Sequence, residues 1–424
     1  MKVVAYREYI QHCIDTGLLQ PVLDRIHCNE IAWLTAREER GKNRALLFKN
    51  VADSPAEVAA NLFGSRQRIC RAMSVKSLPQ LFARVDAAIE DQAEQKEGCR
   101  TPEGYTTIVR PDLADIIPLI KYSREDATPY LTAGIVLVKD PASGQFHICY
   151  VRMAFVGSNK LIFNAATPRI RRIVDSTVGK GNMLDVAILI GPPTEIILMA
   201  GMSMPKGIDK LKVAMALSRG EISLTRDQTT TYVFPSEFVF KATVIPEYAS
   251  EGPFGDLKGL YSYKSRNPIC LVKKVFHRKN PLFHSVSAGT SNEHFWLVTM
   301  GARYHLEKLK RTYDYFLRYA MPSFGVGRIA FLVMKENFDR EEFVQHLWKT
   351  PITRTFVFVN RDVNTRSATD ILWAVTQRAR DVDNFMFSQK KHPVFHERKL
   401  VIDATVDNFE FWDNRRIEVY PRDD

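Results

Sequence analysis

The chain has 424 residues, of which 45% are hydrophobic and 25% carry charge, ordinary values for a globular protein. Its length predicts two or three domains rather than one. No apolar run reaches the roughly 18 residues that a membrane-spanning helix needs, and the first residues turn polar too soon for a signal peptide. We therefore expect a cytoplasmic protein with no membrane segment.

The net charge of +11 comes from 59 basic and 48 acidic residues, which are spread along the chain without a polybasic tail. This charge suits an anionic small ligand as well as RNA, and we expect a small-molecule partner and no nucleic acid. The six cysteines are scattered, with no CxxC pair and no short cluster with histidine. That pattern favours reduced, mostly buried thiols over disulfides or a structural zinc site.

The first 90 residues or so predict a small α/β unit. Apolar residues recur at helical spacing over 7–23, and 44–48 form a short strand. A basic amphipathic helix is expected after 61–66, and another helix over 78–89.

The middle of the chain predicts mainly strands. A polar stretch containing glycine and proline, 92–104, is expected to be a linker into this region. The strands expected are 131–138, 146–156, 160–164, 186–193, 238–245 and 269–276, with a short helix over 208–217. Hairpin signals between the first three strands indicate an antiparallel meander, and the region as a whole indicates a barrel or a sandwich.

The last third returns to an α/β pattern. Strands are expected over 329–333, 355–360 and 399–405, and a helix over 368–378.

One turn holds the strongest candidates for chemistry. Residues 250–261 contain two acids, Glu251 and Asp256, five positions apart with glycine and proline between them. Glycine and proline predict a tight turn, which can aim both carboxylates into one pocket. The ordinary alternative is a surface hairpin with two solvated acids.

Several basic residues lie upstream and downstream of this turn. His147 and Arg152 share one β-rich run, and their spacing places them on opposite faces of a regular strand unless a bulge or turn re-aims one. An arginine within an apolar run needs an anionic partner when it is buried. The basic residues of 168–172 open a helix, where they either hold a phosphate or are solvated. Lys210 and the basic cluster at 277–279 would ordinarily be solvated, although such a cluster also suits RNA.

The stretch 250–261 resembles the PEGPFGE/D-x-x-GY signature of the UbiD-type decarboxylases, which remove CO2 from aromatic or α,β-unsaturated acids with prenylated FMN. The segments TAGIVLVKDP, YVRM, MPKGID and NPICLVKKVFHRKNPLFHS add to the likeness, which runs from about residue 106 to the end. The resemblance implies a carboxy-lyase that catalyses reversible, non-oxidative decarboxylation, with the cofactor as electron sink.

The resemblance also implies roles for individual residues. Arg152 is the expected active-site arginine, Glu251 its carboxylate partner and Asp256 the proton donor. Arg152 would hold the substrate carboxylate through charge-assisted hydrogen bonds while Glu251 fixes its fork, and Asp256 would protonate the carbon that lost CO2. The cofactor contacts implied are His147, Tyr150, Val151, Arg152, Arg169, Lys210 and Arg354.

The family usually binds a divalent metal against the cofactor phosphate through an asparagine and a glutamate, with a histidine in some members. Here those positions read His147, Lys210 and Arg169. A protonated lysine cannot ligate a cation, and two basic groups repel one. We therefore expect no metal, with Lys210 and Arg169 neutralising the phosphate instead.

The expected fold class is a multidomain α+β or α/β protein. A central β-rich, split-barrel-like flavin-binding domain over 106–305 lies between an N-terminal α/β region over 1–105 and a C-terminal α/β oligomerisation domain over 306–424. The implied partners are a carboxylic acid substrate, a flavin prenyltransferase that supplies the cofactor, and further copies of the chain in a dimer or hexamer. The alternative is a non-catalytic flavin or anionic-ligand binder that has lost turnover, which the altered metal positions would also suit.

Overall fold

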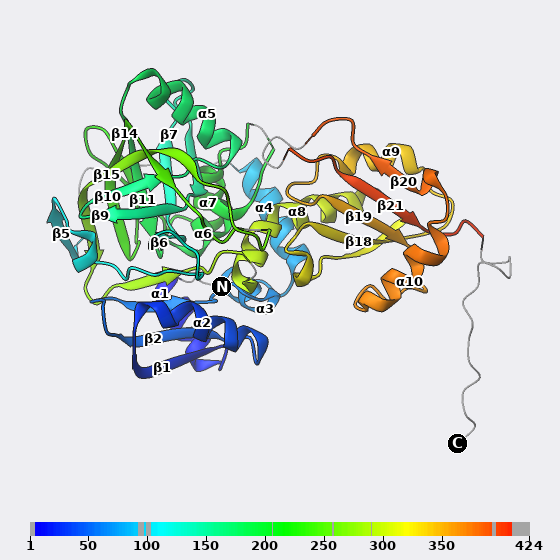
Figure 1. The fold of residues 1–424 in the computed structure, drawn as a ribbon, viewed down its shortest axis with the longest axis horizontal. Helices are drawn as coiled ribbons and strands as arrows, with labels where there is room; N and C mark the ends of the chain where they lie inside the picture. Colours follow the sequence, from blue (N-terminus) through cyan, green and yellow to red (C-terminus); the bar gives the residue numbers. More distant parts are fainter. Residues whose placement is uncertain are drawn as a thin grey trace. The chain divides into compact units, whose positions relative to one another are not determined.

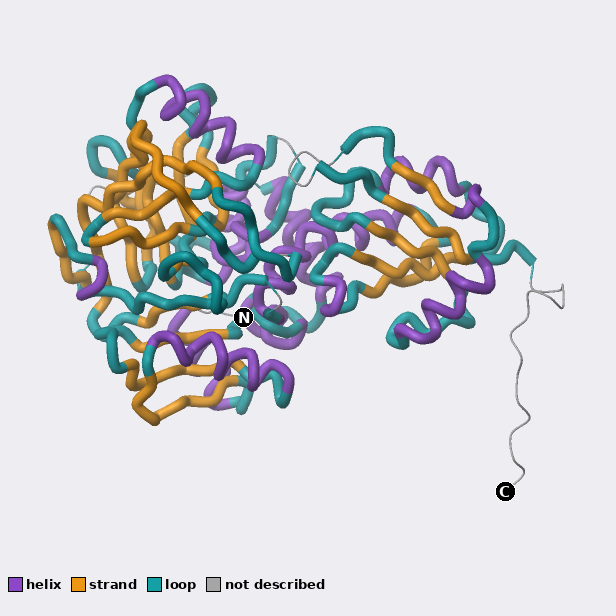
Figure 2. The backbone as a smooth tube through the Cα atoms, viewed as in Figure 1, coloured by secondary structure: helices purple, strands orange, loops and turns teal. Residues whose placement is uncertain are grey.

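The computed structural model describes residues 5–91, 97–98, 103–205, 207–256, 258–289, 291–391 and 396–408. The chain divides into two compact units, Met1–Met300 and Gly301–Asp424 (Figures 1 and 2). No helix within the described ranges is long and apolar enough to cross a membrane. The linker expected over 92–104 lies largely outside the described residues, and the three-part domain division stays a prediction.

The N-terminal part of the first unit is a mixed four-stranded sheet in the order β1-β2-β3-β16. Its strands are β1 (Leu19–Ile26), β2 (Ala45–Val51), β3 (Glu57–Ala60) and β16 (Leu282–Ser285). The helices of this part are α1 (Tyr6–Asp15), α2 (Cys28–Arg40), α3 (Arg66–Ala72) and α4 (Leu78–Glu90). The expected strand over 44–48 and the last two helices are therefore confirmed.

The helix expected over 7–23 is wrong in its second half. Helix α1 ends at Asp15, and Gly17 adopts a φ of +68°, a left-handed conformation that glycine takes without steric cost. The chain then enters β1, which pairs in parallel with β2 from Leu19 onward. The apolar spacing suits a helix or a strand, and the pairing with β2 decides for the strand.

The centre of the first unit is a nine-stranded sheet in the order β6-β9-β10-β15-β14-β11-β7-β8, with β5 paired to β15. Every pair along it is antiparallel, which confirms the β-rich centre. The strands are β5 (Tyr105–Val109), β6 (Tyr130–Leu131), β7 (Ile135–Lys139), β8 (Phe146–Tyr150), β9 (Met153–Gly157), β10 (Lys160–Phe163), β11 (Leu184–Ile190), β14 (Phe238–Glu251) and β15 (Ser265–Arg278).

Two runs expected as single strands are each broken in two. The run over 146–156 becomes β8 and β9, separated only by Val151 and Arg152. These strands lie near opposite ends of the sheet order, since β8 pairs with β7 while β9 pairs with β6 and β10. The run over 131–138 likewise becomes β6 and β7. The sheet therefore curls until its ends meet at Val151 and Arg152. We call these two residues the sheet-closing link.

The helices near the curled sheet are α5 (Pro168–Thr177), α6 (Thr194–Gly201) and α7 (Lys210–Ser218). Helices α5 and α7 agree with the sequence prediction, whereas α6 was not expected. Helix α7 begins directly at Lys210, because Oδ1 of Asp209 accepts hydrogen bonds from the backbone N–H groups of Leu211 (2.9 Å) and Lys212 (3.2 Å). A small sheet adds β4 (Glu97–Gly98), β12 (Ser223–Arg226) and β13 (Thr231–Phe234).

One apolar cluster runs through the first unit and includes side chains from both of its larger sheets. Phe48 of β2, Val136 of β7, Ile188 of β11 and Phe240 of β14 all belong to it and are fully buried. Burial of each such side chain contributes roughly 1.5–3 kcal/mol. The cluster fixes the curled sheet against the N-terminal sheet.

The second unit is a five-stranded sheet in the order β17-β18-β19-β21-β20, whose three central strands are parallel. Its elements are β17 (Phe316–Ala320), β18 (Ile329–Met334), α9 (Arg340–Leu347), β19 (Thr355–Val359), α10 (Ala368–Arg378), β20 (Phe385–Phe387) and β21 (Leu400–Ala404). Helix α8 (Asn292–Thr312) runs across the boundary between the units. The strands and helix expected here are confirmed, which gives the α/β pattern predicted for the last third.

Candidate active site

Arg152 and Glu251 form a buried ion pair inside the first unit. Glu251 is the last residue of β14, and Arg152 lies in the sheet-closing link between β8 and β9. Nη2 of Arg152 lies 3.1 Å from Oε2 of Glu251, whose side chain is 0% exposed against 18% for Arg152. The guanidinium also lies over the ring of Phe254 at 4.6 Å. A carboxylate this deeply buried requires such a cationic partner.

The two oxygens of Glu251 differ in their surroundings. Besides Arg152, Oε2 accepts hydrogen bonds from Asn164 Nδ2 (2.9 Å), Asn267 Nδ2 (3.3 Å) and Ser265 Oγ (3.4 Å). In the described part of the chain, Oε1 of Glu251 and Nε of Arg152 have no hydrogen-bond partner. The protein thus satisfies Oε2 of Glu251, whereas Oε1 of Glu251 and Nε of Arg152 can bind the atoms of a ligand.

Asp256 lies in the turn that follows β14. Its Oδ1 is 4.0 Å from Nη1 of Arg152, and its side chain is 36% exposed. The turn is closed by a hydrogen bond from the Asp256 N–H to the Leu260 carbonyl, at 2.8 Å. The two acids singled out from the sequence therefore meet at one guanidinium, as the turn suggested.

Asp126, which sequence reasoning missed, holds this turn from outside it. The buried Asp126 carboxylate accepts hydrogen bonds from the backbone N–H groups of Gly255 (2.9 Å), Tyr122 (3.0 Å) and Ser123 (3.0 Å). The Ala127 N–H also donates to the Pro253 carbonyl at 3.0 Å. The only available signal was an acid in a loop, since 129 residues separate Asp126 from Gly255.

His294 lies within electrostatic range of Asp256. The Gly289 N–H donates to Nδ1 of His294 at 2.9 Å, so the neutral ring carries its proton on Nε2. Burial lowers the pKa of His294 to about 4, against the opposing effect of the Asp256 carboxylate. His294 is a second residue near the acids that the sequence did not indicate.

His147 and Lys210 lie in a separate basic cluster. Burial lowers the pKa of His147 to about 3, and the positive charges of Lys210, Arg169 and Arg172 lower it further. Among the described residues, neither ring nitrogen of His147 has a hydrogen-bond partner. Three cations and an unpartnered buried imidazole thus lie near one another, which is a chemical environment suited to an anion.

The ammonium of Lys210 is buried, contrary to the ordinary expectation of a solvated lysine. Its Nζ donates to the carbonyls of Ala200 (3.1 Å) and Met202 (3.2 Å). Burial lowers its pKa to about 8, with a smaller lowering by Arg169 and an opposing effect of the Cys149 thiol. No group of three or more His, Cys, Asp or Glu side chains that could hold a metal occurs in the described ranges.

The remaining sequence candidates have ordinary partners. Tyr150 donates its hydroxyl to the Ile197 carbonyl at 3.4 Å, and the Val151 N–H donates to the Gly134 carbonyl at 3.1 Å. Arg169 donates to the Gln145 side chain at 3.3 Å. Arg354 belongs to the second unit and lies 3.2 Å from Glu397, so its role as a cofactor contact stays a prediction.

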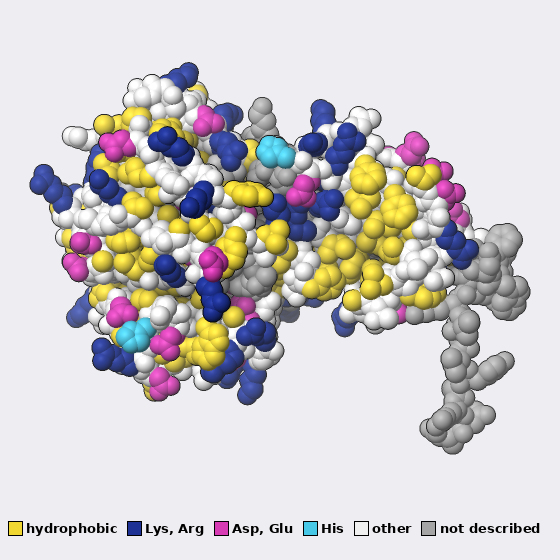
Figure 3. Space-filling model, viewed as in Figure 1, with side chains coloured by type: hydrophobic (Ala, Val, Ile, Leu, Met, Phe, Trp, Pro, Cys, Tyr) yellow, Lys and Arg dark blue, Asp and Glu magenta, His cyan; other side chains and the backbone are white. Residues whose placement is uncertain are grey.

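Basic side chains form no continuous stripe on the face drawn in Figure 3, where they are interspersed with acidic ones. In the cluster at 277–279, Arg278 lies 3.9 Å from the buried Glu237. That arginine therefore has a partner inside the protein.

Comparisons with known proteins point to one family of enzymes. Residues 28–85 match the 3-octaprenyl-4-hydroxybenzoate carboxy-lyase N-terminal domain, and residues 93–291 match the Rift-related domain of the same family. An uncharacterized protein from Archaeoglobus fulgidus is 25% identical over 411 residues, covering 89% of this chain and 85% of that protein. An anhydromevalonate phosphate decarboxylase from Methanocaldococcus jannaschii is 29% identical over 58% of this chain and 57% of its own length.

Solved structures share the fold over nearly the whole chain. The UbiD-class enzyme HmfF from Pelotomaculum thermopropionicum, in complex with prFMN, superimposes with a TM-score of 0.85 at 23% identity, covering 98% of this chain and 97% of that one. The vanillic acid decarboxylase of Sedimentibacter hydroxybenzoicus, in its open form, gives 0.79 at 19% identity, covering 100% and 97%.

The fold, the site and the matched domains define a carboxy-lyase. More particularly, the chain belongs to the UbiD family, as its turn at 250–261 suggested.

Proposed function

We propose that this enzyme catalyses the reversible, non-oxidative decarboxylation of an aromatic or α,β-unsaturated carboxylic acid with prenylated FMN. The observation that carries the proposal is the placement of Glu251 and Asp256 at one guanidinium, 3.1 Å and 4.0 Å from Arg152. An anion binder needs the arginine, but it has no use for a second acid beside it.

Each of the three residues has a distinct task in this reaction. Arg152 binds the substrate carboxylate through charge-assisted hydrogen bonds, and its Nε is available for one of them. Glu251 keeps the guanidinium oriented, because its own position is fixed by several donors. Asp256, which is partly exposed and therefore able to exchange its proton with solvent, delivers that proton to the carbon that lost CO2.

The basic cluster supports a cofactor with a phosphate group. His147 and Lys210, together with Arg169, would hold the phosphate, since an anion relieves the repulsion between the buried Lys210 ammonium and the nearby Arg169 guanidinium. Tyr150, Val151, Arg152 and Arg354 are the other cofactor contacts proposed from the sequence. Prenylated FMN supplies the electron sink for the reacting carbon when it is bound.

We further propose that no divalent metal accompanies the cofactor. Lys210 stands at the sequence position where the family usually carries a metal-ligating glutamate. Its buried ammonium cannot ligate a cation while protonated, and Arg169 adds a second positive charge near it. Elemental analysis of the cofactor-loaded protein should find manganese and magnesium well below one equivalent. One equivalent of either metal, lost together with the flavin, would overturn this part of the proposal.

The main test is expression together with a flavin prenyltransferase, which we propose as the cofactor supplier. Mass spectrometry of the released flavin should identify prenylated FMN, and a panel of aromatic, heteroaromatic and acrylic acids should yield one that releases CO2. Product formed in deuterated water should carry deuterium at the former carboxylate position. Flavin binding with no turnover or exchange across the panel would favour a ligand-binding homologue.

We also propose a homo-oligomer in the cytoplasm, a dimer or a hexamer assembled through the C-terminal region. Light scattering on the purified full-length protein distinguishes these two states. A monomer at micromolar concentration would contradict the proposed assembly.

A further inference from the structure

We propose that Asn164 is the positioning residue that fixes Arg152 and Glu251 relative to each other. The inference rests on the proposed function, which gives the Arg152–Glu251 ion pair its catalytic role. The contacts that support the inference do not depend on any substrate. Asn164 immediately follows β10 and is buried.

Asn164 contacts both members of the ion pair through different groups. Its side-chain Nδ2 donates to Oε2 of Glu251 at 2.9 Å, the shortest of the hydrogen bonds to that oxygen. Its backbone N–H donates to the carbonyl oxygen of Arg152 at 3.3 Å. One residue therefore connects the sheet-closing link to the end of β14.

The loop after Asn164 keeps the residue in place. The Ala166 N–H donates to the Asn164 carbonyl at 2.9 Å, which closes a tight turn behind it. By contrast, Asn267 makes a longer hydrogen bond to Glu251, at 3.3 Å, and its amide also donates to Ser265 at 2.9 Å. Asn164 is thus the better-placed donor of the two.

The chemistry of the amide suits this task. A neutral N–H donor stabilises a buried carboxylate without bringing a charge that competes with Arg152 for Glu251. With Oε2 held by Asn164, rotation of the Glu251 carboxyl group would break that bond and the contact with Arg152 together. The orientation of the guanidinium fork is therefore set before substrate arrives.

Asn164→Asp tests the proposal, because it keeps the side-chain shape and replaces the donor with an acceptor. Its matched control is Asn159→Asp in the β9–β10 turn, where Nδ2 donates to the Val272 carbonyl at 2.9 Å, outside the site. Assays use the full-length, cofactor-loaded enzyme and the acid that reacts best in the panel. We expect kcat per bound flavin to fall about 100-fold for Asn164→Asp and less than about threefold for the control.

The pH profile separates positioning from mere structural support. Among the described ionisable groups, Glu251 and Arg152 contact Asn164 directly, and Tyr130 and Asp256 lie beside that ion pair. Two adjacent carboxyl groups can share a proton, so Asn164→Asp should recover part of its activity, relative to wild type, as the pH falls toward 5. A loss that is uniform with pH, or equal to that of Asn159→Asp, would overturn the proposal.

Crystal structures of Asn164→Ala and Asn164→Asp without cofactor give a readout that needs no substrate. We expect the Glu251 carboxylate to leave Nη2 of Arg152 in at least the aspartate variant. An unchanged pair in both variants overturns the inference even if the enzyme decarboxylates. A displaced pair supports the inference even if no acid in the panel reacts, in which case only the proposed function fails.

Discussion

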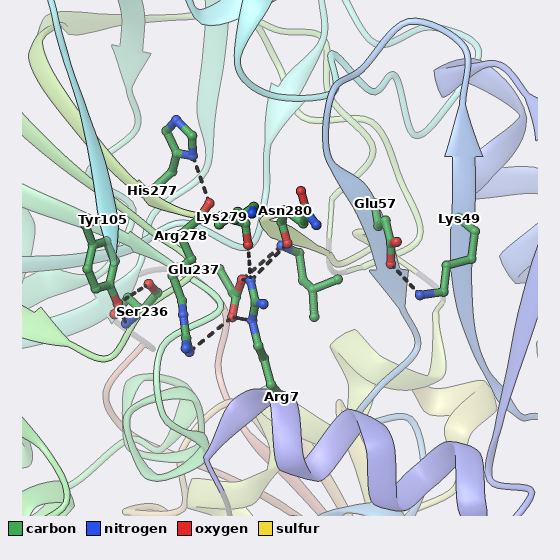
Figure 4. Close-up of polar contacts among 11 residues, drawn as sticks. Arg7, Lys49, Glu57, Tyr105, Ser236, Glu237, His277, Arg278, Lys279 and Asn280 are labelled. Atoms are coloured by element: carbon green, nitrogen blue, oxygen red, sulfur yellow. Dashed lines mark hydrogen bonds and ion pairs between the residues drawn. The ribbon is translucent and has the colours of Figure 1, made fainter. Parts of the chain in front are cut away.

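Arg7 and Glu237 join the first helix to the start of β14 by a two-point ion pair between residues 230 positions apart. Nε and Nη2 of Arg7 lie 2.7 Å and 2.6 Å from Oε1 and Oε2 of Glu237 (Figure 4). Nη2 also donates to the carbonyls of Lys279 (3.1 Å) and Asn280 (2.9 Å), in the loop after β15. This one side chain therefore ties α1 to both long strands of the curled sheet.

Arg7→Ala should lower the free energy of unfolding of the first unit by about 2–4 kcal/mol, because it leaves the buried Glu237 short of a partner. Glu237 is 1% exposed, and its remaining side-chain partners among the described residues are the Leu282 N–H at 3.0 Å and Arg278 at 3.9 Å. Urea denaturation measures the change. The control is Lys49→Ala, whose 2.9 Å pair with Glu57 is 40% and 29% exposed, with an expected loss below about 1 kcal/mol. Equal losses would show that the Arg7 pair contributes no more than a surface pair.

Asp256→Asn should lower turnover about 10²- to 10⁴-fold, because the amide cannot deliver a proton to the reacting carbon. CO2 release and deuterium incorporation into product should fall together, while binding of the acid changes little, since Arg152 remains paired with Glu251. The exposed Asp175→Asn on α5 is the control and should leave turnover unchanged. Full activity in Asp256→Asn would assign the proton to another group.

FMN binding to the cofactor-free protein should take up a proton near pH 8. Burial lowers the pKa of Lys210 to about 8, so the ammonium is partly neutral there, and a phosphate favours its charged form. Affinity for FMN should therefore be higher below pH 8 and fall as the pH rises above it. Calorimetry in two buffers of different ionisation enthalpy measures the uptake, and Lys210→Met should abolish it. Identical uptake in that variant would place the proton elsewhere.

The cofactor-free protein should lose stability on acidification partly through His147. Its folded pKa, about 3, lies below the ordinary value of 6.5, so the unfolded chain binds the proton first. The contribution is fully present above pH 6.5 and is lost as the pH falls toward 3. His147→Gln should therefore flatten the fall of the melting temperature between pH 6.5 and 4. Parallel curves for variant and wild type would contradict a neutral buried histidine.

Much of the site followed from local sequence chemistry. Glycine and proline after Glu251 indicated a turn, and the turn does bring Asp256 to the same guanidinium as Glu251. The spacing of His147 and Arg152 placed them on opposite faces of a regular strand unless a bulge or turn re-aimed one, and the structure breaks the strand at Val151 and Arg152. Such features can be predicted from the sequence because they depend on residues a few positions apart.

The residues that support the site could not be predicted from the sequence, because their partners are far away along the chain. Asn164 and Asp126 act on partners 87 and 129 positions away, and no local pattern connects them. The burial of Lys210 depends on carbonyls left free at the end of α6, a helix that the sequence did not indicate. Pairing with β2 likewise turned the second half of an expected helix into β1.

The two-residue link between β8 and β9 also bears on the order of folding. Hairpins such as β7–β8 and β9–β10 need only short loops and can form early. Arg152 lies between strands from opposite ends of the sheet order, and it meets Glu251, 99 residues later, only when the strands between them have paired. Catalytic competence should therefore be among the last properties that a newly made chain acquires.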